Sequence, residues 1–102
     1  MRITLFAAAL AAAALAPGLV AAGPIGNACM ASDRSRGDAA LCRCIQAAAD
    51  ATLNRGEQRR AARFFRDPHQ AQTVRASTSA ADNAFWQRYV TFGQLAEARC
   101  AG

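Results

Sequence analysis

The feature that most constrains this chain is a set of four cysteines that all follow an apparent export signal. Residues 1–22 begin with a single basic residue, Arg2, and continue with an apolar stretch over residues 3–15. The segment ends in Val20-Ala21-Ala22, the small-residue pattern of a signal-peptidase site. We therefore expect a signal peptide that is cleaved after residue 22, and a chain that matures in the periplasm or is secreted. Disulfides persist in such oxidising compartments.

The apolar stretch is too short for a membrane anchor, because a spanning helix needs about 20 apolar residues. We therefore expect this segment to be cleaved and not to anchor the protein. The mature chain, residues 23–102, is expected to form one domain without a transmembrane helix. A core of this size rarely supplies more than about 3–5 kcal/mol, so small exported domains are commonly stapled by disulfides. An even number of cysteines suits that need.

The cysteines, Cys29, Cys42, Cys44 and Cys100, allow three pairings. A bond between Cys42 and Cys44 is excluded, because side chains two apart on a helix point about 200° apart. We prefer Cys29–Cys42 with Cys44–Cys100, since Cys29 and Cys42 lie at equal distances from a turn near residues 35–36. The alternative, Cys29–Cys44 with Cys42–Cys100, stays open. The chain lacks the Cys-x-x-Cys spacing of zinc and redox sites, so we expect two disulfides, no free thiol, no metal and no cofactor.

Capping signals predict an all-α fold, a small bundle of four short helices with a fifth short helix over residues 24–33. The four helices run from about 39 to 53, 55 to 66, 68 to 76 and 80 to 99. Their start signals are Asp38, Asn54 with Glu57, Asp67 with Pro68, and the end of the polar run over residues 77–79. No window alternates as a half-buried strand does.

Periodicity predicts which face of each helix is buried. In the first long helix the apolar stripe is Leu41, Ile45, Ala48 and Thr52, with Arg43, Gln46, Asp50 and Asn54 on the opposite side. The second helix presents Ala61, Phe64 and Phe65. The last presents Phe85, Tyr89, Phe92 and Ala96, with Cys100 continuing that face and Trp86 at its edge, as a border of the core or an exposed contact.

All twelve basic residues are arginines; without Arg2, eleven remain against seven acidic residues, a net charge of +4. Part of this excess forms a stripe on the second helix, and its members are Arg55, Arg59, Arg60, Arg63 and Arg66. We expect these charges to be solvated and unpaired along the helix. The stripe is a candidate face for an acidic protein surface or an anionic membrane. Nucleic acid is not expected for an exported chain whose aromatic residues are needed in the core.

The sequence offers no catalytic set. His69 is the single histidine and lies at the start of a helix beside Asp67, where a solvated terminal residue is the common case. The acidic residues are scattered, and no nucleophile, base and orienting group can be assembled. We therefore expect no enzymatic activity and no catalytic residue.

Three stretches resemble a family of short, exported, four-cysteine proteins of Gram-negative bacteria. They are Leu41-Cys42-Arg43-Cys44-Ile45-Gln46, residues 63–72, and Phe85-Trp86-Gln87-Arg88-Tyr89, closed by Cys100. Some members of that family carry the label "arginine transporter", and the family implies no catalytic residues. Together these features favour a structural or protein-interaction module. The alternative is a periplasmic small-ligand-binding or transport-accessory protein, as the family label implies.

Overall fold

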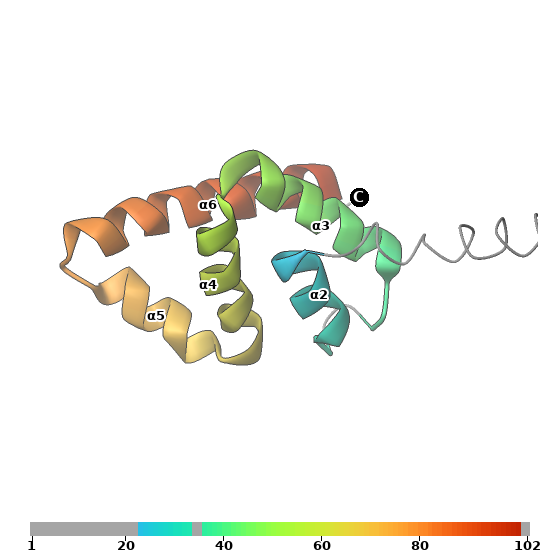
Figure 1. Cartoon of the computed structure of the whole chain (residues 1–102), viewed down its shortest axis with the longest axis horizontal. Helices are drawn as coiled ribbons and strands as arrows, with labels where there is room; N and C mark the ends of the chain where they lie inside the picture. The colour runs from blue at the N-terminus through green and yellow to red at the C-terminus, as the bar shows by residue number, and fades with distance from the viewer. Residues whose placement is uncertain (1–22, 34–35, 101–102) are drawn as a thin grey trace, which may run out of the picture.

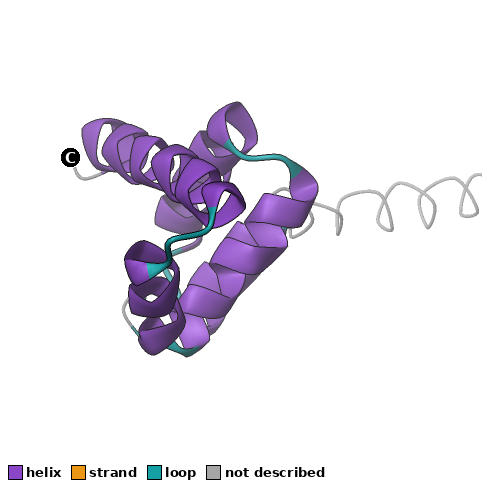
Figure 2. Cartoon of the chain, turned by 90° about the vertical axis from the view of Figure 1, so that its left-hand side faces the viewer, coloured by secondary structure: helices purple, strands orange, loops and turns teal. Residues whose placement is uncertain are grey.

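The chain is helical throughout the part that the computed structural model describes, residues 23–33 and 36–100. Its helices are α2 (Pro24–Ala31), α3 (Ala39–Thr52), α4 (Arg55–Arg66), α5 (Pro68–Ala76) and α6 (Ala80–Cys100) (Figure 1). Short loops join them, and no strand occurs within these two ranges (Figure 2). The prediction of an all-α bundle is confirmed. The expected signal peptide over residues 1–22 lies outside the described residues and stays a prediction.

The helix starts follow the capping residues of the sequence. The Asp38 carboxylate accepts a hydrogen bond from the Leu41 N–H at 3.0 Å. Asn54 and Glu57 form a complete capping box, with each side chain accepting from the other residue's N–H. Asp67 accepts from the His69 N–H at 3.1 Å, and Pro68 takes the first helical position. Local chemistry therefore sets three of these boundaries.

The helices are arranged so that α2 lies beside α4 while α3 and α6 cross on one side of the molecule (Figure 1). The helix α2 packs against both α3 and α4, and α3 packs against α6. The short helix α5 runs from the end of α4 to the start of α6 and contacts both. As a result, α2 and α4 form two walls of one surface.

Two disulfides hold this arrangement, in the preferred pairing. Cys29–Cys42 joins α2 to α3, and Cys44–Cys100 joins α3 to the last residue of α6. No free cysteine remains. The two bonds leave α3 from different sides, so this one helix is tied to both ends of the described chain.

Aromatic side chains of α4 and α6 form the thicker part of the core. Phe64 packs edge-on against Phe85 and Tyr89, with ring centroids 6.1 and 5.1 Å apart. Phe92 extends the cluster from Tyr89 at 5.9 Å. Trp86 is half-buried and lies 5.2 Å from Tyr89, so it forms a border of the core. The predicted face of the last helix is confirmed, with Phe85 and Phe92 as its buried members.

The predicted face of α3 was partly wrong. Its buried residues are Cys42, Gln46, Ala48 and Ala49, whereas Leu41 and Ile45 are half-buried. The expectation that Gln46 faces solvent is overturned, because its side chain is only 5% exposed. The physical reason is that α2 covers this side of α3, held there by the Cys29–Cys42 bond.

Gln46 belongs to a buried polar network that joins three helices. Its Oε1 accepts from the Gly26 N–H of α2 at 2.7 Å, and its Nε2 donates to Asp50 and to Gln58 of α4, both at 2.8 Å. Gln58 in turn donates to Asp50 at 3.1 Å and to the Leu53 carbonyl at 3.2 Å. Among the described residues no buried side-chain polar atom lacks a partner. Such a satisfied network fixes the relative positions of α2, α3 and α4.

Two ion pairs set the register of α4 against α6. Arg60 donates to Asp82 at 2.6 Å, and Arg88 pairs with Glu57. The partners follow in the reverse order along α6, at the place where the two helices cross (Figure 1). The Arg60 guanidinium also lies 4.6 Å from the centre of the Phe85 ring. This geometry suits a cation–π contact.

Acid should weaken these ion pairs. Burial raises the pKa of Glu57, but its hydrogen bonds with Arg88 and the Asn54 N–H lower it more, so the pKa lies below its usual 4.5. The Arg60 hydrogen bond holds the pKa of Asp82 below its usual 3.8. A lowered pKa means that the folded state binds protons less readily than the unfolded state. The stabilisation is therefore complete above about pH 4.5 and is lost as the pH falls through the folded-state pKa values.

The corresponding measurement is urea unfolding of the wild type and of Glu57→Gln from pH 7 to pH 2. The difference in unfolding free energy between the two proteins should be largest at neutral pH and should shrink toward pH 2. Glu97→Gln removes an exposed acid with no ion pair among the described residues, and it should show a smaller change. A Glu57→Gln difference that stays constant over the whole range would contradict the assignment.

Candidate functional site

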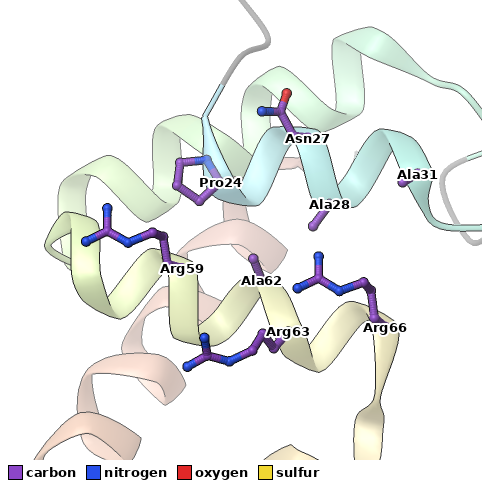
Figure 3. Close-up of a pocket in the computed structure, with 8 residues that line it drawn as sticks. All are labelled: Pro24, Asn27, Ala28, Ala31, Arg59, Ala62, Arg63 and Arg66. Atoms are coloured by element: carbon purple, nitrogen blue, oxygen red, sulfur yellow. The ribbon is translucent and has the colours of Figure 1, made fainter.

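A groove between α2 and α4 brings arginines together with small side chains (Figure 3). It has a volume of about 420 Å³ and is open to solvent. We call it the basic groove, and its lining residues are Pro24, Asn27, Ala28 and Ala31 of α2 and Arg59, Ala62, Arg63 and Arg66 of α4. Three cations and no acidic residue line it.

Helical spacing explains the α4 wall. Arg59, Arg63 and Arg66 fall at i, i+4 and i+7, within an arc of about 60°. Ala62 lies beside them, buried against the neighbouring helix. In Figure 3 the Arg66 side chain extends toward Ala28, and Arg59 lies level with Pro24. The Arg63 head group extends away from α2, so the cations are spread along and across the groove.

The α2 wall is built from residues that allow close approach. Its members recur at i, i+3, i+4 and i+7, and two of them are alanines. The wall is anchored by Cys29–Cys42 and by the bond from the Gly26 N–H to Gln46. A Cβ added at Gly23 would lie 2.4 Å from the Gln46 Oε1, so any larger residue there would displace the Gln46 amide from its hydrogen bonds. The α2 wall is therefore tied to α3 by contacts that lie behind the groove.

The groove arginines carry uncompensated charge. The ion pairs among the described residues are Arg60–Asp82 and Arg88–Glu57, and neither involves Arg59, Arg63 or Arg66. Arg63 and Arg66 lie in the last turn of α4, where cations interact favourably with the helix dipole. All three side chains are exposed. The positive potential is thus available to a partner.

The structure places the residues of the predicted arginine stripe in different environments. Arg59, Arg63 and Arg66 share the groove, whereas Arg55 is exposed one turn earlier and does not line it. The expectation that Arg60 is unpaired was wrong, because Arg60 bonds Asp82 and covers Phe85. The reason is rotational: Arg60 lies about 100° around the helix from Arg59, on the side that faces α6.

Sequence reasoning missed the α2 wall. Pro24, Asn27, Ala28 and Ala31 are small or neutral residues in a helix too short for a clear periodic signal. The preferred Cys29–Cys42 pairing placed α2 against α3, but nothing in the sequence placed it against α4. A groove of this kind requires knowing which two helices are neighbours.

A second hollow continues the groove past its Arg66 end. It has a volume of about 250 Å³ and shares Ala28, Ala31 and Arg66 with the basic groove. Its further lining residues are Ser32, Asp33 and Phe65. We call it the terminal hollow. It adds an aromatic surface and a carboxylate at one end of the row of cations.

The geometry gives little support for a metal site or for a site built on the histidine. His69 is exposed on α5, and within residues 23–33 and 36–100 no three His, Cys, Asp or Glu side chains are grouped to hold a metal ion. None of the described helices is long and apolar enough to cross a membrane. Comparisons with protein-family models, curated proteins and solved structures found no match to this chain.

Proposed function

We propose that this protein is a small periplasmic or secreted interaction module that binds an acidic segment of a partner protein in the basic groove. The observation that carries the proposal is that three arginines without an ion pair among the described residues line one groove that holds no acidic residue. Arginine forms paired hydrogen bonds with carboxylates, which gives both affinity and orientation. No catalytic role is proposed.

The shape of the groove favours a peptide over a small ligand. Small-molecule sites usually enclose most of the ligand surface, whereas this groove is open along its length. Free arginine, the ligand implied by the family label, is a poor fit, because the groove presents three guanidinium groups and no carboxylate. Like charges that face each other without a counter-ion are unfavourable.

The shape also favours a peptide over a membrane. The cations flank a concave surface with α2 as its second wall, and a flat headgroup layer would not fill it. A chain segment fits such a groove by laying one face between two helices. An anionic membrane therefore becomes the competing outcome of the test.

Changing Arg59 and Arg63 together to Gln should weaken acidic-peptide binding by at least about tenfold and leave folding nearly unchanged. Glutamine preserves helix propensity, and exposed unpaired charges contribute little to stability. Wild-type binding should weaken as salt rises, because the interaction is electrostatic. Fluorescence anisotropy of a labelled glutamate-rich peptide would measure this, with circular dichroism to follow folding.

The matched control is Arg43→Gln with Arg75→Gln, which removes the same charge from exposed positions outside the groove. It should bind nearly as well as the wild type. If both double variants weakened peptide binding equally, the effect would depend on net charge alone. This result would contradict the basic groove as the binding site. Binding only to anionic vesicles, or only to free L-arginine by calorimetry, would contradict a peptide-binding role.

A further inference from the structure

We infer that the basic groove and the terminal hollow form one composite site for an acidic segment that carries an apolar anchor residue next to its carboxylates. This inference rests on the proposed function and specifies its partner. It rests on a second observation, the continuity of an arginine-lined surface with a hollow beside an aromatic ring. Arg66, Ala28 and Ala31 line both parts, so one bound segment would contact both.

The dimensions suit a short chain segment. The walls run in the same direction, with Pro24 level with Arg59 and Ala31 toward Arg66 (Figure 3). Each wall spans seven residue steps, which corresponds to about 10 Å of helix. Carboxylates at i, i+4 and i+7 of a bound helix would match the rise between the three arginines. Alternate residues of an extended segment would match it nearly as well.

The terminal hollow combines polar groups with an apolar part, formed by Phe65, Ala28 and Ala31, and this part suits an aliphatic side chain. Phe65 is half-buried and packs against the core, so one part of its ring is covered while another lines the hollow. Ala28 and Ala31 provide further apolar surface without filling the space. An aliphatic side chain placed there would remove apolar surface of both partners from water. Apolar anchors in pockets beside charged contacts are common in protein interfaces.

The charges that line the terminal hollow limit which residues of the bound segment can follow its apolar anchor. Asp33 lines the hollow but not the basic groove, so the one carboxylate of the combined lining lies at this end, where it offsets the charge of Arg66. A further carboxylate beyond the anchor would face Asp33 and be disfavoured. The composite site therefore selects acidic residues, then an apolar residue, then a neutral or basic residue. Phosphate-bearing lipids present no such ordered sequence.

The test compares labelled peptides on the oxidised protein by fluorescence anisotropy. One peptide carries three glutamates at i, i+4 and i+7 in a Gln/Ala background. Two others add a leucine one turn after the last glutamate or one turn before the first, because the direction of binding is one of the results. One of the leucine peptides should bind about tenfold more tightly than the peptide without leucine. Moving the leucine between the glutamates should remove that gain.

Two variants locate the anchor. Phe65→Ala removes the aromatic wall, and Ser32→Trp fills the hollow while retaining Phe65. Each folded variant should lose the leucine-dependent gain but keep salt-sensitive binding of the peptide without leucine. Val90→Ala removes an exposed apolar side chain elsewhere and should retain the gain. If Phe65→Ala fails to fold, Ser32→Trp and amide shift changes at residues 32 and 65 provide the same test.

The outcomes separate this inference from the proposed function. Tight binding of all acidic peptides, with no effect of leucine or of Ser32→Trp, would overturn the anchor and leave the acidic-segment site intact. Failure of every acidic peptide to bind would overturn both. A leucine-dependent gain that survives Ser32→Trp would place the anchor elsewhere and would also overturn the inference.

Discussion

Removing the Cys44–Cys100 disulfide, by Cys44→Ser with Cys100→Ser, should lower the free energy of unfolding by about 2–4 kcal/mol. The bond spans 56 residues and ties the last residue of α6 to α3. Without it the unfolded chain gains conformational freedom, and the end of α6 loses its fixed contact. For a domain of this size, such a loss approaches its whole net stability. Urea unfolding of both proteins in oxidised form measures the difference.

The matched comparison is Cys29→Ser with Cys42→Ser, which removes the bond that spans 13 residues. Loop length alone predicts a loss smaller by roughly 1 kcal/mol. This second variant should instead impair the basic groove more, because Cys29–Cys42 anchors its α2 wall. An unchanged unfolding midpoint for the Cys44/Cys100 variant would show that the bond has no structural role.

Replacing Gln46 by Met should cost about 2–4 kcal/mol of stability, although the two side chains are nearly the same length. The amide of Gln46 accepts from the Gly26 N–H and donates to Gln58 and Asp50. Methionine cannot replace these bonds, so buried polar groups on two other helices lose their partner. Each such loss costs about 1–3 kcal/mol. Chemical unfolding monitored by circular dichroism would measure the effect.

Gln94→Met is the control, since Gln94 is exposed on α6. It should change stability by less than about 0.5 kcal/mol. The Gln46 variant should also weaken acidic-peptide binding, because α2 is positioned partly through Gly26. A Gln46→Met protein as stable as the Gln94→Met protein would contradict the role of the network.

The sequence predicts the local features of this fold well, because they depend on chemistry within a few residues. Asp38, the Asn54–Glu57 pair and the Asp67-Pro68 step each satisfy free backbone groups at a helix start. The preferred cysteine pairing followed from helical rotation and from the equal distances of Cys29 and Cys42 from a turn. These arguments need no knowledge of which helices are neighbours.

The sequence predicts burial less well where polar residues lie inside. Gln46 and Gln58 are polar residues, yet they are only 5% and 2% exposed. Their burial depends on each other, on Asp50 and on the Gly26 N–H, which come from three helices. A pattern based on hydrophobicity places glutamine outside, since its cost of burial is offset only by partners that tertiary structure brings together.

The arginine stripe shows the same division. The sequence by itself determined that α4 is a helix with a cationic arc, because the spacing of Arg59, Arg63 and Arg66 is a property of one helix. Only the tertiary structure decided that Arg60 is paired with Asp82 on α6 and that α2 supplies the second wall of the groove. Helical rotation is local, whereas a groove and an ion pair between helices depend on packing across residues far apart in the chain.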